Sequence, residues 1–333
     1  MKIKYIFKKL IKNLIDIYSA NFGQHKKESK SPRLWIMMYH RILPKEDPRY
    51  ENEEPGMIVE PDTLKMHLQV LKKEFTMVKL SDWIERKNNN QTLPKKACAI
   101  TFDDGWIDNH EYAFPILEKE NIPATLFIVS DMVTNGQEFW PNRISRILKQ
   151  PKELLQEIEW LAPYLSDKKI DRETLATIIS NLKKHSDQQV LELILNAEKE
   201  LNLKRNLSPT LMNWEQIKQC SQKGLIEIGS HTANHIRLKQ ELPPSLYSQE
   251  IMLSKQKIEK ELNKTVKLFC YPNGDYCNDA IKEVSKYYIA AVTTEKGINS
   301  SNELKRFTLA RIPVHQDISD TPRRLLARIS NWR

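Results

Sequence analysis

The sequence lacks the features that mark a disulfide-rich or membrane-spanning protein. Only four of its 333 residues are cysteine, and no two of them stand in CxxC spacing. So few cysteines in so long a chain argue against a disulfide framework and favour free thiols in a reducing compartment. No apolar run is long enough to cross a bilayer. Glycine is also rare, with eight residues in the whole chain, so a glycine that lies in a motif is informative.

Charge is present in excess, and part of it lies at the N-terminus. The formal net charge of +9 suits an acidic partner, but no nucleic-acid motif accompanies it, and we expect no nucleic-acid partner. In residues 1–18, apolar residues recur at helical spacing with lysines mostly between them. This pattern predicts a basic amphipathic helix, which either lies on an anionic membrane surface or packs on the protein itself. The lysines make it a poor signal peptide, so we expect a cytoplasmic protein or one peripheral on the inner membrane face.

The rest of the chain alternates short apolar strands with helices, except in one stretch. Such alternation is typical of parallel β/α units, and seven or so strands favour a barrel over an open sheet. Residues from about 140 to 212 are instead poor in glycine, and their apolar residues recur at helical spacing. We therefore expect an N-terminal helix and linker over 1–33, and an α/β barrel over 34–333 with a helical insertion at about 140–212.

Three segments place polar residues directly after predicted strands, where β/α barrels carry their active sites. The first is ITFDDGW, residues 100–106. Adjacent residues of an extended segment point in different directions, so one carboxylate could bind a metal ion while its neighbour acts as a base. The alternative is a simple turn or helix cap, because Asp and Gly favour both.

The second and third segments are IGSHTANHIRL, residues 228–238, and LFCYPNGDY, residues 268–276. His231 and His235 are four apart, and on a helical turn both imidazoles would share one face and could ligate one ion. Alone, such a pair could equally be core or surface histidines. The Pro-Asn-Gly turn can present a backbone N–H to an oxyanion, although alone it indicates only a tight turn. Taken together, one carboxylate and two imidazoles suit a catalytic Zn²⁺ with an open position.

The motifs TFDDG, SHTANH and YPNG, in this order, resemble those of the polysaccharide deacetylase family (carbohydrate esterase family 4, the nodulation-protein homology domain). The resemblance runs from Ile36 to about Val314, interrupted by the helical insertion. It implies a distorted (β/α)7-type barrel. It also implies a metal-dependent hydrolase that removes N-acetyl, or O-acetyl, groups from a polysaccharide or lipid-linked glycan.

The resemblance also assigns roles to matching residues. Asp103 would be the catalytic base, and the backbone N–H of Asn273 would help to stabilise the oxyanion. Three residues would hold Zn²⁺ or another divalent ion: Asp104, His231 and His235.

The chain departs from the family pattern near its end. Members often place a catalytic-acid histidine in a Leu-x-His motif, but this chain reads TLARIPVHQD there, and His315 fits the motif poorly. Some members instead carry an early Met-Tyr-His-Arg, which this chain has at residues 38–41. We therefore expect His40 to be the acid or a substrate contact. Arg311, at the end of a predicted strand, would either orient Asp103 or form a structural salt bridge.

Three other functions fit parts of the pattern. The chain could be a deformylase or another amidase that acts on a lipid-linked sugar, which the basic N-terminal helix would suit. It could be a catalytically inactive glycan-binding barrel, although both aspartates and both histidines are present. The helical insertion could also recruit a partner protein.

Overall fold

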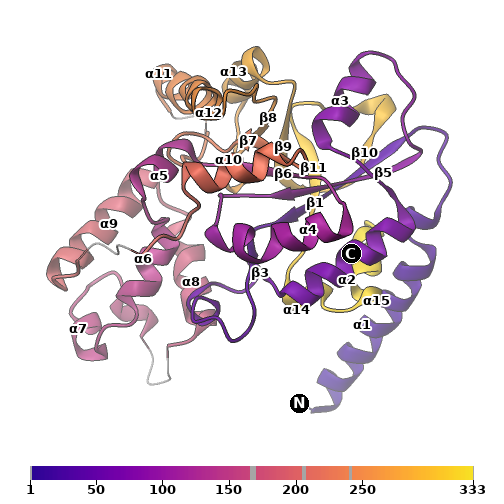
Figure 1. Cartoon of the computed structure of the whole chain (residues 1–333). Coiled ribbons are helices and arrows are strands. Elements are labelled where there is room, and N and C mark those ends of the chain that lie inside the picture. Colours follow the sequence, from indigo (N-terminus) through magenta and orange to yellow (C-terminus); the bar gives the residue numbers. More distant parts are fainter. Residues whose placement is uncertain (1, 166–169, 205–207, 240–241, 333) are drawn as a thin grey trace.

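The computed structural model describes residues 2–165, 170–204, 208–239 and 242–332. Seven parallel strands close into a barrel (Figure 1), each paired with the next along the chain, and the last returns to the first. The strands are β1 (Arg33–Tyr39), β5 (Lys96–Phe102), β6 (Ala124–Ile128), β7 (Ile226–Ser230), β8 (Leu268–Cys270), β9 (Ala290–Lys296) and β11 (Leu309–Pro313). The barrel predicted from the sequence is confirmed.

Four shorter strands lie beside the barrel. Strand β4 (Thr76–Met77) pairs in parallel with β5, and β10 (Asn299–Ser300) pairs antiparallel with β1. Strands β2 (Arg41–Ile42) and β3 (Ile58–Val59) form a separate pair just beyond the end of β1.

The barrel strands read as continuous apolar runs because both of their faces are buried. Along β1, Leu34 and Ile36 pack with residues of other strands inside the barrel. Trp35 and Met37 point the other way, into the layer between the strands and the outer helices. Helix α3 (Leu80–Asn88) contributes Trp83 to the interior cluster and so covers the end of the barrel at which the strands begin. The other end of the barrel remains available for a site.

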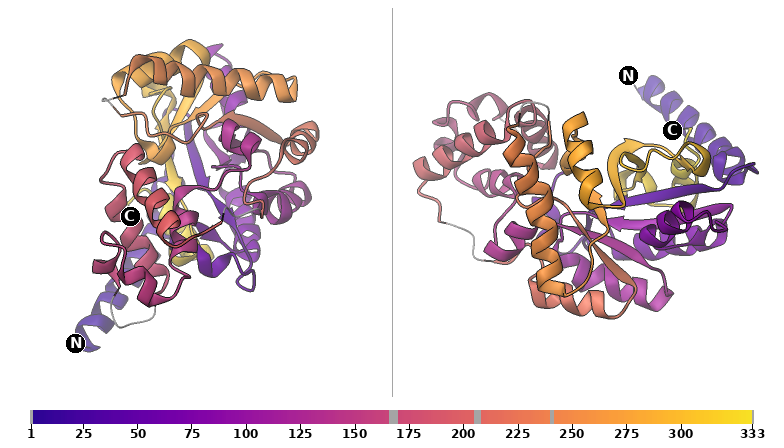
Figure 2. Two further views of the ribbon diagram at one scale, coloured as in Figure 1. Left: turned by 90° about the vertical axis from the view of Figure 1, so that its left-hand side faces the viewer. Right: turned by 90° about the horizontal axis from the view of Figure 1, so that it is seen from above.

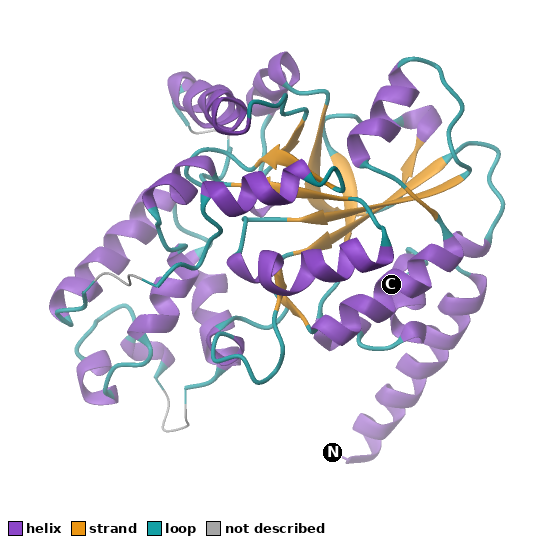
Figure 3. Cartoon of the chain, in the orientation of Figure 1, coloured by secondary structure: helices purple, strands orange, loops and turns teal. Residues whose placement is uncertain are grey.

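Helices surround this barrel (Figure 3). The longer ones are α2 (Pro61–Glu74), α4 (Phe114–Glu120), α10 (Trp214–Gln222), α12 (Ser254–Leu262), α13 (Asn278–Tyr287) and α15 (Pro322–Ile329). Shorter ones are α5 (Ser130–Asn135), α11 (Pro244–Ser248) and α14 (Gln316–Ser319). Two π-helical turns, η3 (Asn109–Ala113) and η5 (Gln249–Leu253), continue directly into α4 and α12.

The N-terminal helix α1 (Lys2–Phe22) packs against α15 and reaches four residues beyond the predicted 1–18, into the stretch predicted as a linker. Its last turns expose large apolar side chains, including Leu14, Tyr18 and Phe22, and the Tyr18 ring stacks on Trp332. Among the described residues, no helix has the length and apolar character needed to cross a membrane.

Four helices between β6 and β7 form a group with its own apolar core. They are α6 (Trp140–Ile147), α7 (Lys152–Gln156), α8 (Arg172–Leu182) and α9 (Asp187–Glu200). Arg143 and Arg146 of α6 both bind Glu198 of α9, at 2.6 and 2.5 Å, which ties the group together. We call residues 140–212 the helical segment. It lies to one side of the barrel, remote from α1 (Figures 1 and 2).

Candidate active site

Strand β5 delivers two buried aspartates to the end of the barrel. Asp103 and Asp104 follow Phe102, and Asp104 has a left-handed backbone (φ 76°), as does Gly105 (φ 84°). A non-glycine residue rarely adopts this conformation, and it turns the two carboxylates into different surroundings. The indole N–H of Trp106 donates to Oδ2 of Asp104 at 2.9 Å, which leaves Oδ1 facing the two histidines.

The segment after β7 brings both histidines to Asp104, but on a loop rather than on the helical turn that their spacing suggested. Thr232 and His235 have positive φ values of 66° and 60°, which no helical turn contains. The buried carboxylate of Glu250 holds the loop, because it accepts hydrogen bonds from the backbone N–H groups of Ala233 and Asn234. The prediction of a helical turn was therefore wrong. The two imidazoles nevertheless converge, with ring centroids 4.9 Å apart.

These three residues form a set of ligands that suits a divalent ion. Oδ1 of Asp104 lies 3.4 Å from Nε2 of His231 and 3.5 Å from Nε2 of His235. Two ligands bound at about 2.0 Å to a tetrahedral zinc ion are separated by about 3.3 Å, so the spacing fits. Nδ1 of His231 lies 2.8 Å from the carbonyl oxygen of Cys270. Because a carbonyl only accepts, Nδ1 carries a proton, which leaves Nε2 as the nitrogen that can give its lone pair to an ion.

Electrostatics favour an ionised Asp104. Burial alone would raise the pKa of its carboxyl group. Hydrogen bonds from His231 and His235 outweigh burial and hold the pKa of Asp104 well below its ordinary value. The donor set therefore offers one negative oxygen and two imidazole nitrogens, a combination that zinc and similar ions accept.

Asp103 has a different environment, dominated by Arg311. The guanidinium is fully buried and donates to both Asp103 oxygens at 2.7 Å, in the two-pronged geometry that orients a carboxylate. The same group is fixed by the carbonyl of Thr293 at 2.7 Å and the hydroxyl of Thr101 at 3.1 Å. Burial raises the pKa of Asp103, but the charge and hydrogen bonds of Arg311 lower it by more than burial raises it. The carboxylate therefore stays ionised.

The two candidate acid histidines occupy different places. His40, at the end of β1, lines the pocket and puts Nε2 3.7 Å from Oδ2 of Asp103. Burial lowers the pKa of His40 despite the neighbouring aspartates, so the imidazole is neutral near pH 7. Nδ1 of His315 instead lies 3.2 Å from Oδ2 of Asp317. His315 is not among the described residues that line the pocket. The structure brings His40, and not His315, to the aspartates.

The Pro-Asn-Gly turn after β8 also reaches this pocket. Asn273 has a left-handed backbone (φ 57°), and both it and Thr294 line the cavity. Gly274 follows with φ 73°, and a Cβ there would lie 2.0 Å from the hydroxyl oxygen of Thr294. Glycine is therefore required for the turn to pack this closely on β9.

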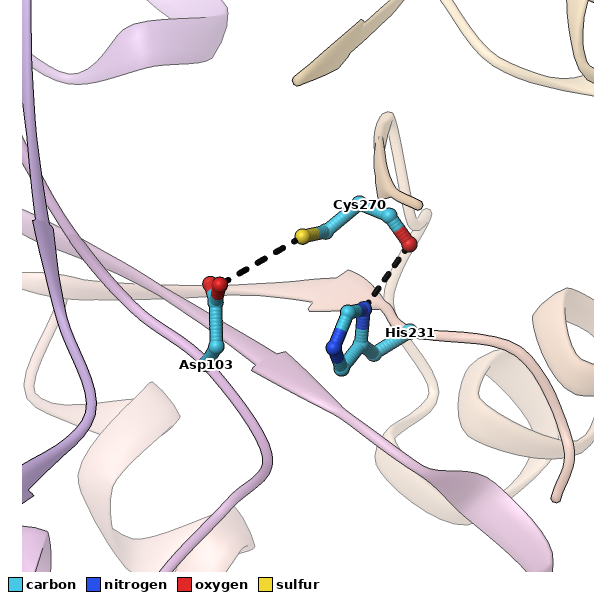
Figure 4. Close-up of side chains that lie close together, drawn as sticks. All are labelled: Asp103, His231 and Cys270. Atoms are coloured by element: carbon cyan, nitrogen blue, oxygen red, sulfur yellow. Dashed lines mark hydrogen bonds between the residues drawn. The ribbon is translucent and has the colours of Figure 1, made fainter. Parts of the chain in front are cut away.

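One residue of the site was not predicted from the sequence. Cys270 is buried, with its sulfur 3.6 Å from Oδ2 of Asp103 and 3.3 Å from the Arg311 guanidinium. Figure 4 shows its thiol directed to Asp103 and its carbonyl directed to His231. Burial raises the pKa of this thiol, so Cys270 is a neutral packing and hydrogen-bonding group. The sequence could have indicated Cys270, because this residue directly precedes the YPNG motif.

The proposed base, the proposed metal ligands and the Pro-Asn-Gly turn border one cavity of about 230 Å³, whereas Arg311 and Cys270 are not among the residues that line it. Its floor holds both aspartates, both histidines of the loop after β7, and His40. Its walls include aromatic residues, of which Phe139 packs edge-on against His235 at 5.0 Å. The cavity thus combines a possible metal site, an oriented carboxylate and an apolar wall, which is the composition of a small-ligand or catalytic site.

Comparisons with known proteins show which family of sequences this chain resembles. The sequence pattern of the family described as "Polysaccharide deacetylase" matches residues 90–292, more than half of the chain. YxkH of Bacillus subtilis (strain 168), which carries a polysaccharide deacetylase name, is 22% identical over 295 residues, or 88% of this chain and 75% of YxkH.

Two solved structures share the fold. The deacetylase PplD of Streptococcus pyogenes, in complex with acetate, has a TM-score of 0.60 at 22% identity and covers 89% of this chain and 98% of its own. A de-N-acetylase from Aggregatibacter actinomycetemcomitans has a TM-score of 0.54 at 19% identity and covers 86% of this chain and 96% of its own.

Proposed function

Because the chain belongs to the polysaccharide deacetylase family, we propose that it hydrolyses N-acetyl groups on a glycan and releases acetate and a free amino sugar. One observation carries this proposal. Asp104, His231 and His235 converge on one point beside a second, separately oriented carboxylate, all within a single cavity. The names of the two structural neighbours, one with bound acetate and one a de-N-acetylase, support an N-acetyl substrate.

The proposed metal ligands are Asp104, His231 and His235. A divalent ion held there, Zn²⁺ or another, would supply Lewis acidity and lower the pKa of water. Asp103 is the proposed base: its carboxylate is ionised and aimed by Arg311, so it can accept the proton of the attacking water. The N–H of Asn273 is the proposed donor to the oxyanion.

His40 is the proposed acid for the departing amine. Its imidazole is neutral near pH 7, so it must first acquire a proton. The nearest source is Asp103, whose Oδ2 lies 3.7 Å from Nε2 of His40. A proton taken by Asp103 can therefore pass to His40 and then to the amine, which returns both residues to their starting states.

A lipid-linked glycan is favoured by one feature of the N-terminal helix. Leu14, Tyr18 and Phe22 are 65%, 57% and 57% exposed on α1, and five lysines precede them within the first 12 residues of the sequence. Exposed apolar and aromatic residues that follow a lysine-rich stretch of sequence suit the surface of an anionic membrane. We propose that α1 contacts such a surface, at the inner membrane face, and holds the enzyme near a lipid-linked substrate. The same placement keeps a deformylase of lipid-linked sugars as the second candidate.

The test is a substrate panel assayed for both acids. Purified protein with added Zn²⁺ is incubated with N-acetylated, O-acetylated and N-formylated glycans, and acetate and formate are quantified. The matched variant Asp103→Asn keeps the shape of the site and removes the base. We expect acetate from N-acetylated glycans, lost in the variant. Formate alone would replace the proposal with the deformylase, and neither acid from any glycan would favour the inactive binding barrel.

A further inference from the structure

The walls of the cavity come from two segments that lie outside the three motifs. One wall is the start of the helical segment and the turn between α8 and α9, which contribute Trp140, Lys183 and Asp187. The other is the loop between β2 and β3, which contributes Glu54 and Met57. Both walls line the same cavity as the aspartates and histidines of the site. They therefore limit which ligands can reach those residues.

Arg237 links the first wall to the loop after β7, which carries His231 and His235. It lies two residues after His235 and is 7% exposed. Its guanidinium binds Asp187 at 2.6 Å and the carbonyl oxygens of Lys183 and His185 at 2.6 and 2.5 Å. Asp187 also accepts a hydrogen bond from the Arg237 backbone N–H at 2.9 Å. The turn between α8 and α9 is therefore a fixed part of the site.

Arg172, at the start of α8, fastens the helical segment to the second wall. Its guanidinium donates to the carbonyl oxygens of Glu53 and Glu54 at 2.7 and 3.3 Å and lies 4.9 Å from the centre of the Tyr50 ring. The helical segment is thus tied to the loop after β7 on one side and to the β2–β3 loop on the other. It bridges the two sides of the catalytic end.

Two charged side chains in these walls keep hydrogen-bonding capacity for a ligand, although burial raises the pKa of Glu54 to about 6 and the charge of Lys183 partly offsets this. The neighbouring charges are already paired, since Glu53 binds Arg41 at 2.8 Å and Asp187 binds Arg237. Within the described chain, no hydrogen bond or ion pair engages the carboxylate of Glu54 or the ammonium of Lys183. Both are only partly exposed, and both line the cavity beside the half-buried indole of Trp140. A carboxylate, an ammonium and an aromatic face suit the hydroxyl groups and apolar face of one sugar ring.

We infer that this cavity binds the terminal sugar unit of a glycan and excludes the interior of a polymer. Glu54 and Lys183 hydrogen-bond hydroxyl groups of that unit, and Trp140 packs on its ring. The volume of about 230 Å³ is below the roughly 300–1,000 Å³ of pockets for drug-sized ligands, which leaves room for one sugar but not several. A polymer would also have to pass the helical segment, which is tied to both sides of the catalytic end. The inference rests on the proposed function for its glycan substrate.

Two measurements on one set of oligosaccharides test which sugar unit binds separately from whether the reaction occurs. The probe is a series of β-1,4-linked N-acetylglucosamine oligosaccharides with a labelled reducing end. Mass spectrometry locates each unit that loses its acetyl group. Saturation-transfer NMR with Asp103→Asn shows which units contact the protein without turnover. We expect one terminal unit to be both deacetylated and saturated, at a rate that does not rise with chain length.

The other outcomes separate the two claims. Deacetylation or saturation of interior units would overturn the terminal-unit inference and leave the proposed function intact. Terminal saturation without acetate release would support the pocket and contradict the proposed reaction. An absence of both release and binding would overturn the inference as well.

Variants of the walls give a second test. Lys183→Ala and Glu54→Ala should each raise KM about tenfold with little change in kcat, because they remove hydrogen bonds made to the bound sugar before the reaction. The matched control is Lys184→Ala, an exposed neighbour whose ammonium donates to the side-chain oxygen of Asn181 and which is not among the residues lining the cavity. Unchanged KM in both wall variants, with unchanged melting temperatures, would overturn the assignment of these two residues.

Discussion

Replacing Arg311 by lysine would measure how strongly this one side chain controls Asp103. The arginine makes two bonds of 2.7 Å to the carboxylate and is held by Thr101 and Thr293. A lysine ammonium keeps the positive charge but cannot reproduce the planar fork, so at least one Asp103 oxygen loses its donor. A hydrogen bond to a charged group contributes about 1.5–3 kcal/mol. The variant should therefore lose about 2–3 kcal/mol of folding stability near pH 7.

The same change should move the ionisation of Asp103. The pKa of this carboxyl is lowered in the folded protein, so its contribution to stability is present above the unfolded pKa of about 3.9. It is lost as the pH falls through the folded pKa. Since each pKa unit corresponds to about 1.4 kcal/mol, loss of one charge-assisted bond should raise the pKa of Asp103 by about 1–2 units. The acid side of the pH–rate profile should move toward neutral pH by the same amount.

Two assays check this prediction. Urea unfolding across the acid range gives stability against pH, and acetate release across the same range gives the rate profile. The control is Arg306→Lys, an exposed arginine whose guanidinium donates to the side-chain oxygen of Asn88 and lies 4.8 Å from the centre of the Phe307 ring. An Arg311→Lys protein whose stability and acid limb both match wild type would refute the reasoning that Arg311 keeps Asp103 ionised.

Three further changes have defined outcomes. Burial lowers the pKa of His67 to about 4, so wild-type stability should fall by about 2–3 kcal/mol between pH 7.5 and 4.5, and His67→Gln should flatten this slope in urea titrations. His235→Gln should weaken Zn²⁺ binding by roughly 100-fold or more in a competition assay with a chelating dye, because one of three ligands is lost. Gly274→Ala should cost about 1–3 kcal/mol by thermal unfolding, since its Cβ would meet Thr294, and should cost more than Gly56→Ala, where nothing lies within 4 Å.

The sequence was most informative where a pattern is repeated and local. Barrel strands have both faces buried, so their apolar runs stand out, and the residues that follow Phe102, Ser230 and Cys270 therefore fall at one end of the barrel. The observed limits differ by a few residues. Strand β7 runs to Ser230 and so includes the first three residues of the segment 228–238, which was expected to follow the strand, because its pairing with β6 continues to Ile128.

Features that depend on distant contacts could not be predicted. The spacing of His231 and His235 suggested a helical turn, but the loop conformation is fixed by Glu250, which belongs to a later helix. The cavity walls depend on Arg172 and Arg237, which contact residues 119 and 50 positions away. A local sequence pattern carries no information on contacts between residues so far apart in the chain. The walls of the cavity could therefore be identified only in the folded structure.

The central claim is that Asp104, His231 and His235 hold a divalent ion while Asp103 serves as the base. The most direct measurement determines bound Zn²⁺ and acetate release on the same preparations of wild type and Asp103→Asn, with an N-acetylated glycan as substrate. The account predicts one ion per chain in both proteins and acetate release in the wild type alone. Full activity in Asp103→Asn, or no bound ion in the wild type, would contradict it.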